Sequence, residues 1–371
     1  MIIPEFFKAP PSVYAVGNDY QIFVAVDQPI VMWVKVGNEE YYDDSNGVLR
    51  SGRLVHRMTV PMSELDRERK YTVCCRIVYE RLSYFSKTSN VLEFVFNFRP
   101  VSGDKIRAYM IADTHSHVNA PIETGRFFGD QLDLLILNGD VPDNSREIKA
   151  FVSIHRIVGE VTKGEIPALF VRGNHDLRGL HAEDMADYIP VRNGFTYYTF
   201  RLGPVWGIAL DCGEDKPDDH EAYGFTNCCH AFRKRETEYL RQVIRNAGEE
   251  YAAEGIKYRL VVCHVPFSFV GKPPFDIEQD IYREWCRLLR EEVKPDVMLC
   301  GHRHQYYISR PGSEYDHLGQ PCSVVVGAKP GPEYYESVGT AVELEPAGIR
   351  VRFTNQEHQV LGDETLPLTA R

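Results

Sequence analysis

The fold is decided by the stretch Leu132-Asp-Leu-Leu-Ile-Leu-Asn-Gly-Asp-Val-Pro-Asp143, in which an apolar run stops at a polar motif. Short apolar runs of this kind are typical of strands buried on both faces of a sheet. Four more runs along the chain end in the same way. The five runs span residues 106–111, 132–137, 168–171, 260–263 and 297–300. Because functional groups gather beyond the carboxyl ends of strands in open α/β sheets, we expect the motifs to meet at one site.

The motifs after these runs carry carboxylate, amide and imidazole side chains. They are Asp113-Thr-His115, Gly139-Asp-Val-Pro-Asp143, Gly173-Asn-His-Asp176, His264 and Gly301-His-Arg-His304. The candidate metal ligands among them are Asp113, His115, Asp140, Asn174, His264, His302 and His304. Seven ligands are too many for one tetrahedral ion but suit two ions that share a bridging carboxylate, for which Asp140 is the candidate. Oxygen and imidazole donors without thiolate favour manganese, iron(II) or zinc over calcium.

Each motif alone also has a structural interpretation. Asp113-Thr-His115 could cap a strand end, the Gly-Asp and Gly-Asn-His-Asp motifs could be simple turns, and a lone His264 would usually be a hydrogen-bonded structural histidine. The metal site is favoured because all of these structural interpretations would have to be true at once for the site to be absent. Asp113 and His115 are two residues apart, as are His302 and His304, so each pair projects to one side if the extended conformation persists. Gly139 permits close backbone approach.

Segments with helical periodicity lie between the apolar runs, at residues 145–162, 233–254 and 277–292. Residues 197–202 and 205–210 are expected to form a hairpin around Gly203-Pro204. Further strands are expected at 323–326, 340–344 and 349–353. Strands that alternate with helices predict an α/β domain over residues 104–371.

Residues 1–100 show no convincing helical pattern and are expected to form short strands separated by turns. The expected strands span residues 13–15, 21–26, 31–36, 54–60, 71–79 and 91–98. This spacing favours an all-β sandwich of the immunoglobulin or fibronectin III kind, with a plain antiparallel sheet as the alternative. Arg99-Pro-Val-Ser-Gly-Asp104 has the character of a linker, so we expect a domain boundary there.

The composition of the chain argues against several classes of function and location. The formal charge of -11 would repel a nucleic-acid backbone, so non-specific nucleic-acid binding is not expected. No apolar run is long enough to cross a bilayer, and the first residues lack the pattern of a signal peptide. Nine scattered cysteines without a CxxC pair indicate reduced thiols and a cytoplasmic protein.

The five motifs, in this order, resemble those of the calcineurin-like metallophosphoesterase superfamily over about residues 105–355. The resemblance implies a four-layer αββα sandwich with two mixed sheets. It implies that one metal is held by Asp113, His115 and His304, that the other is held by Asn174, His264 and His302, and that Asp140 bridges them.

The same resemblance assigns roles beyond the ligands. His175 would assist the leaving group or the transferring phosphoryl group, Asp176 would orient His175 by hydrogen bonding, and Asp143 would be an acid behind the ligands. Purple acid phosphatases have a similar β-domain layout, but they carry a tyrosine where this chain has Asp143 and lack a match to His115. The coloured tyrosinate–iron site is therefore not expected.

The implied activity is that of a dinuclear-metal-dependent phosphoesterase, in which a metal-bridging hydroxide attacks a phosphomonoester or phosphodiester. A small phosphorylated substrate is expected, and no membrane partner. The β-region could contact another protein. Alternatives are a nuclease, a site of the amidohydrolase or PHP type that begins at Asp113-Thr-His-Ser-His117, and a non-catalytic scaffold of the same fold. The acidic loop 211–224 could form a rim over the site, with candidate contacts at His220, Tyr223, Phe225 and Arg233.

Overall fold

A computed structural model describes residues 3–327, 329–330 and 336–371. Its largest element is a ten-stranded mixed sheet, in which three parallel strands carry the first three motifs. In order across the sheet the strands are β23 (Val360–Leu366), β22 (Gly348–Asn355), β21 (Ser337–Glu345), β11 (Ile106–Ile111), β12 (Leu134–Asn138), β13 (Ala168–Val171), β1 (Ser12–Val16), β2 (Asp19–Ala25) and β7 (Val55–Pro61), and β20 (Lys329–Pro330) pairs with β21.

A six-stranded sheet carries the last two motifs. Its order is β14 (Tyr198–Leu202), β15 (Val205–Leu210), β16 (Tyr258–Cys263), β17 (Val297–Cys300), β19 (Ser323–Val326) and β18 (Tyr307–Ser309). The four middle strands are parallel, and the two outer strands are antiparallel to their neighbours. The inner faces of the two large sheets share one hydrophobic core, to which Ile136 and Val262 both belong.

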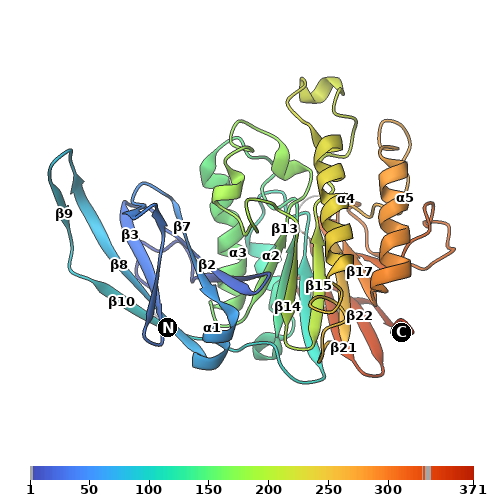
Figure 1. Cartoon of the computed structure of the whole chain (residues 1–371), viewed down its shortest axis with the longest axis horizontal. Helices are drawn as coiled ribbons and strands as arrows, with labels where there is room; N and C mark the ends of the chain where they lie inside the picture. Colours follow the sequence, from blue (N-terminus) through green and yellow to red (C-terminus); the bar gives the residue numbers. More distant parts are fainter. Residues whose placement is uncertain (1–2, 328, 331–335) are drawn as a thin grey trace.

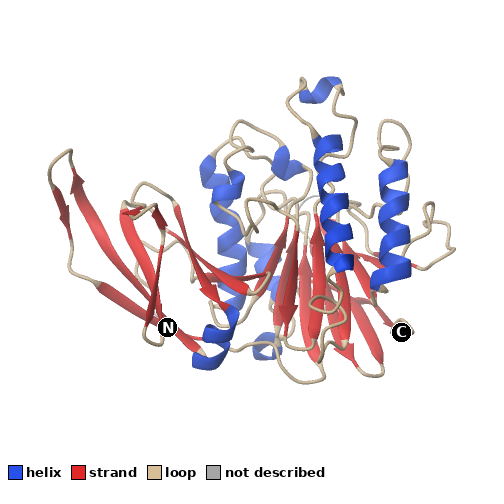
Figure 2. Cartoon of the chain, viewed as in Figure 1, coloured by secondary structure: helices blue, strands red, loops and turns tan. Residues whose placement is uncertain are grey.

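Helices cover the outer faces of both sheets, as Figure 2 shows. α2 (Asn119–Gly125) and α3 (Val152–Thr162) pack on the ten-stranded sheet through a second core. α4 (Cys229–Arg245) and α5 (Gln279–Leu288) pack on the six-stranded sheet through a third. The expected αββα sandwich is confirmed, because two helical layers enclose two sheets.

The N-terminal region is strand-rich, as expected, and its two sheets pack as a β-sandwich. One sheet contains β10 (Leu92–Asn97), β8 (Lys70–Arg81), β3 (Ile30–Val36) and β4 (Glu39–Tyr42), with β9 (Ser86–Thr88) paired to β8. After β4, the chain forms a small two-stranded ribbon of β5 (Asp44–Ser45) and β6 (Val48–Leu49). The other sheet of the sandwich is formed by β1, β2 and β7.

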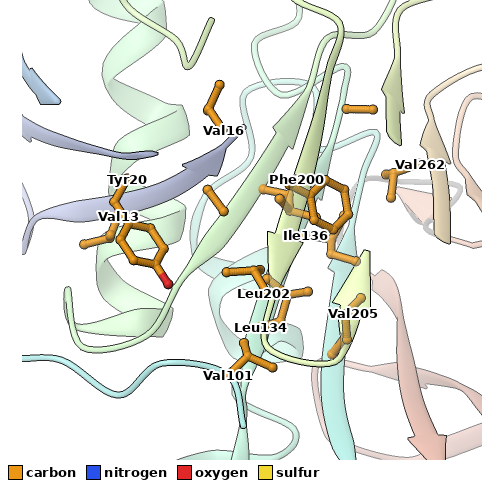
Figure 3. Packing of buried hydrophobic residues seen from close by; sticks show 14 of the residues in the cluster. Val13, Val16, Tyr20, Val101, Leu134, Ile136, Phe200, Leu202, Val205 and Val262 are labelled. Atoms are coloured by element: carbon orange, nitrogen blue, oxygen red, sulfur yellow. The ribbon is translucent and has the colours of Figure 1, made fainter. Parts of the chain in front are cut away.

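Those three strands also extend the catalytic sheet, which the sequence did not predict. β1 pairs in parallel with β13, with Tyr14 opposite Ala168. Figure 3 shows Val13, Val16 and Tyr20 in the same packed region as Phe200 and Leu202. The two parts of the chain, residues 1–100 and 104–371, thus share a sheet. Their division into two domains remains a prediction about which parts fold as units.

Several local expectations differ from the structure. The short helix α1 (Met62–Glu68) lies in the region expected to be all-β, and it buries only Met62 and Leu65. Two buried residues are too few to produce a visible period. α3 begins after a 3-10 turn at Ile148–Phe151, α4 ends at Arg245, and a π-helix at Leu289–Val293 continues α5. The hairpin of β14 and β15 is confirmed. β23 was missed because its exposed residues interrupt the apolar pattern.

Within the described residues, no helix combines the length and apolarity needed to cross a membrane. All nine cysteines are free, and only Cys228 is exposed.

Candidate metal centre

All seven candidate ligands lie just beyond the ends of five parallel strands. Asp113 and His115 follow β11, Asp140 follows β12, and Asn174 follows β13. The six-stranded sheet supplies the remaining ligands, His264 after β16 and the pair His302 and His304 after β17. Both sheets thus deliver ligands to one edge of the sandwich.

A first group consists of Asp113, His115 and His304, whose possible ligand atoms all lie within 4.8 Å of one another. The Nε2 atoms of His115 and His304 are 3.0 Å apart. Two imidazole nitrogens that bind one ion at about 2.1 Å and at a right angle would be about 3 Å apart. His304 Nε2 also lies 3.4 Å from Asp113 Oδ1. The spacing therefore fits a shared ion.

A second group consists of Asp140, His264 and His302, again with possible ligand atoms within 4.8 Å of one another. Nδ1 of His302 lies 2.9 Å from Oδ1 of Asn174, so the amide oxygen belongs to this group as well. His264 directs Nε2 to the group, because its Nδ1 donates to the carbonyl of Asn138 across 2.7 Å. Such a partner on the remote nitrogen is common for metal-binding histidines.

His264 lies where the two groups meet. Its Nε2 is 3.2 Å from Asp140 Oδ2 and 3.6 Å from Asp113 Oδ1. This nitrogen is buried and has no hydrogen-bond partner. A buried polar atom without a partner is costly unless something binds it. The orphaned nitrogen, the two carboxylates and the mixed donor set therefore fit a site for transition-metal ions.

The backbone is strained where the ligands stand. Of the fourteen described non-glycine residues with positive φ angles, six lie at the site: Asp113, His115, Ser116, Asp140, His302 and His304. Left-handed backbone is unfavourable for residues other than glycine, and its concentration at one place is typical of functional sites. The expected extended conformation at 113–115 and 302–304 is wrong, since the strands end earlier and tight turns aim these side chains.

Two glycines make room for the ligands. A Cβ atom on Gly139 would lie 2.6 Å from Nδ1 of His264, and one on Gly173 would lie 2.2 Å from Oδ1 of Asp140. Neither position can therefore carry a side chain without moving a ligand. The close approach expected at Gly139 is confirmed.

The electrostatics of the site favour cation binding. Burial lowers the pKa of His302 to about 4, which keeps the imidazole neutral and able to bind a metal. Burial would also lower the pKa of His264, but the carboxylates of Asp140 and Asp113 raise it to about 10. Burial acts to raise the pKa of Asp140, yet the charge of His264 holds it below its ordinary value. The two carboxylates thus require a positive charge, which metal ions would supply.

His175 lies beside the first group, with its ring centroid 4.7 Å from that of His115. Nδ1 of His175 lies 2.9 Å from the backbone carbonyl of Asp143, and the Asp143 carboxylate lies 3.3 Å from Nδ1 of His115. The expected contact with Asp176 is wrong. The buried Asp176 carboxylate instead accepts hydrogen bonds from the backbone N–H groups of Gly173 and Asp140, so it shapes the turn.

Sequence reasoning missed two residues that contact the site. Asn138 and Arg178 lie beside the ligand motifs, and the only signal in the sequence was their position, directly before Gly139 and three residues after His175. The four candidate rim contacts differ in their exposure and in their partners. Phe225 is 81% exposed, whereas Arg233 is buried and binds the backbone of the acidic loop at Cys212 and Glu214. His220 caps a short turn, and Tyr223 binds Glu214.

A family model for calcineurin-like phosphoesterases matches residues 106–306, which is more than half of the chain. The chain belongs to the calcineurin-like phosphoesterase family. The matched range contains all five motifs and both ligand groups. As a member of this family, the chain is a metal-dependent hydrolase of phosphoric esters.

Solved structures support the fold of this phosphoesterase. A purple acid phosphatase from yellow lupin (Lupinus luteus) seeds is 12% identical, with a TM-score of 0.57, and the match covers 97% of this chain and 74% of that one. The structure of PhoD is 11% identical, with a TM-score of 0.56, and the match covers 98% and 90% of the two chains. Both similarities extend over the N-terminal β-region. No curated protein sequence matches the chain significantly.

Proposed function

We propose that this phosphoesterase holds two metal ions and hydrolyses a small phosphate monoester or diester. The observation that carries the proposal is the meeting of two donor groups at the orphaned Nε2 of His264. One group alone would supply a single ion. Two adjoining groups, joined through buried carboxylates, support a dinuclear site.

The proposed ligands of one ion are Asp113, His115 and His304, and those of the other are Asn174, His264 and His302. Asp140 is the proposed bridge, since its carboxylate approaches His264 and its Oδ1 is steered by the backbone N–H of His175 across 2.8 Å. When bound, manganese, iron or zinc ions would neutralise the phosphoryl oxygens and acidify the attacking water.

His175 is the proposed catalytic residue, because it adjoins the ligands without belonging to either proposed ligand set. The backbone carbonyl of Asp143 accepts a hydrogen bond from Nδ1 of its ring. A side chain at this place can exchange a proton with the reacting groups, which commonly contributes about 100-fold to 10,000-fold to a rate. Asp176 supports the site through the turn rather than through His175.

A cavity of about 350 Å³ adjoins His302 and His304. Its wall combines aromatic side chains with both cations and carboxylates, and it is lined in part by Phe267, Phe269, Phe275, Tyr282, Lys272, Arg303, Glu214 and Asp215. Pockets of about 300–1,000 Å³ commonly bind small molecules. The cavity supports a small ester, whose non-phosphoryl part would lie beside the metals.

The test is a reconstitution experiment. The chain is stripped of metal, loaded with manganese, iron(II) or zinc, and assayed with p-nitrophenyl phosphate and bis(p-nitrophenyl) phosphate. We expect two ions per chain by elemental analysis and turnover that depends on them. His302→Ala should lose metal and activity, while His358→Ala, which removes a histidine outside both groups, should lose neither. A chain that binds two ions and cleaves neither ester would favour the scaffold alternative.

The cytoplasmic location and a protein contact through the N-terminal sheet remain predictions. Fractionation of cells that express the tagged chain would test the first, and its oligomeric and bound state after purification would test the second.

A further inference from the structure

Arg178 contacts His175 directly and lies outside both ligand groups. Its Nη1 is 2.9 Å from Nε2 of His175. The contact follows from local structure, because residues 175–177 form a 3-10 turn and the N–H of Arg178 donates to the carbonyl of His175. Side chains three residues apart in such a turn lie on the same side.

The two hydrogen bonds of the His175 ring place its proton. The carbonyl of Asp143 can only accept, so the nitrogen that faces it, Nδ1, carries the hydrogen. The guanidinium of Arg178 can only donate, so the nitrogen that faces it, Nε2, offers its lone pair. Both nitrogens of His175 are therefore occupied, and the orientation of the ring is determined.

Arg178 is itself held by the acidic loop 211–224. Its Nε and Nη2 donate to the two carboxylate oxygens of Glu214 across 2.8 and 2.9 Å, and Nη2 also lies 3.4 Å from Asp215. The side chain of Glu214 is fully buried. The hydroxyl of Tyr223 lies 2.8 and 3.0 Å from oxygens of the same two carboxylates, which share its one proton. A two-pronged pair of this kind restricts both partners strongly.

The loop is in turn fixed to the helical layer. Buried Arg233 on α4 donates to the carbonyls of Cys212 and Glu214. Lys216 pairs with Asp215 across 2.8 Å, so the two carboxylates of the network face two cations, Lys216 and Arg178. A continuous set of contacts therefore runs from α4 through the loop to the ring of His175.

We propose that Arg178 is a positioning residue for the reaction, held by Glu214 and Asp215 so that it fixes the ring of His175 with Nε2 as an acceptor. The inference rests on the proposed function in one respect, that His175 takes part in hydrolysis.

The first test measures the ring without metal or substrate. The full chain is labelled with ¹⁵N in histidine, stripped of metal, and studied by two-bond ¹H–¹⁵N correlation spectra, with His175→Asn used for assignment. We expect a protonated Nδ1 and an unprotonated Nε2 that accepts a hydrogen bond. Arg178→Met should move the Nε2 resonance away from its hydrogen-bonded position, or average it between tautomers.

Variants of the loop test whether the hold on Arg178 matters. Glu214→Gln should move the His175 signals in the same direction, although Glu214 does not touch His175. Asp218→Asn is the matched control, because Asp218 lies in the same loop but binds the N-terminus of α4 at Cys229 and His230. It should leave the His175 signals in place. If Arg178→Met does not fold, Glu214→Gln gives the same readout, since it keeps Arg178 and removes the charge of its two-oxygen partner.

The second test is kinetic. In the loaded enzyme, Arg178→Met should lower kcat by about tenfold to a hundredfold with KM changed by less than about twofold, and Arg178→Lys should recover part of kcat. Unchanged His175 signals in Arg178→Met would overturn the proposal. Movement in Arg178→Met but none in Glu214→Gln would overturn the part assigned to the loop. A raised KM with unchanged kcat would also overturn it, because that result describes substrate binding. If no ester is cleaved at all, the proposed function fails, while the spectra still decide whether Arg178 positions His175.

Discussion

The backbone carbonyl of Asn138 accepts a hydrogen bond from Nδ1 of His264 across 2.7 Å, and this contact joins the two sheets at the metal centre. Asn138 ends β12 in the ten-stranded sheet, and His264 follows β16 in the six-stranded sheet. The side-chain amide of Asn138 strengthens the joint by donating to the carbonyls of Cys263 and Leu299 across 3.2 and 3.1 Å. The two ligand groups therefore hold their spacing through a buried polar link.

Removing that amide should destabilise the fold. Asn138→Ala would leave the carbonyls of Cys263 and Leu299 without these donors, and a buried unsatisfied group costs about 1–3 kcal/mol. Urea unfolding of the metal-free chain should show a loss of this size. Asn90→Ala, at an exposed position, should change stability by less than about 0.5 kcal/mol. Equal stability of the two variants would show that the link is unimportant.

Asp140→Asn should abolish binding of the two metal ions. The amide keeps an oxygen that can accept from the N–H of His175, so the fold should survive, but the bridging charge is lost. Elemental analysis of the reconstituted variant is the measurement, with circular dichroism as the check on folding. Asp143→Asn, at a side chain 57% exposed, should retain both ions. Full occupancy in Asp140→Asn would rule out the bridge.

His175→Asn should separate catalysis from metal binding. His175 lies outside the proposed ligand sets, so the variant should keep two ions, while kcat falls by about 100-fold to 10,000-fold. Metal content and turnover are measured on the same preparation. Loss of metal together with activity would assign His175 to the ligands instead. That alternative is a real one, because His115, Asp143 and His175 also bring possible ligand atoms within 4.8 Å of one another.

The junction between the β-region and α3 should make stability depend on pH. Burial lowers the pKa of His155 from 6.5 to about 4, against a hydrogen bond to the carbonyl of Tyr188 that raises it. Between these values the unfolded chain binds the proton and the folded chain does not. Stability should therefore fall as pH falls from 6.5 to 4, by up to about 3 kcal/mol from this group.

Unfolding free energies of the metal-free chain at pH 4.5 and 7 measure the effect. His155→Gln keeps an N–H for the Tyr188 carbonyl but cannot titrate, so the difference between the two pH values should shrink. An unchanged difference would assign the acid sensitivity to other groups. Phe23 stacks on His155 with ring centroids 4.8 Å apart, so some loss of packing is expected at both pH values.

A fragment of residues 104–371 should not behave as an independent domain. Its β13 would lose β1 as a neighbour and present an open sheet edge, and the core shared with Val13 and Tyr20 would be exposed. We expect aggregation or weak solubility under conditions in which the full chain is monodisperse by gel filtration. A monomeric fragment that binds two ions would support residues 1–100 and 104–371 as separate folding units.

Much of this protein could be predicted from short stretches of sequence. The five strand-end motifs identify candidate ligands because each motif belongs to one strand and the turn after it, and parallel strands bring such turns to a common edge. The α/β class follows from the alternation of strands and helices, and the resemblance of the motifs to the family implies the αββα layers. Local reasoning failed where the signal was short or exposed, as at α1 and β23, and where a turn replaced an extended chain, as at His115 and His304.

By itself, then, the sequence determined the family and the layers that the family implies, and it predicted the ligand set. Only the tertiary structure decided that β1 joins β13, that Asn138 links the two sheets, and that His175 is held by the Asp143 carbonyl and Arg178 instead of Asp176. The reason is physical. A motif specifies the chemistry and the local turn, whereas a hydrogen bond between segments depends on which turns the packing of two sheets brings within about 3 Å of each other.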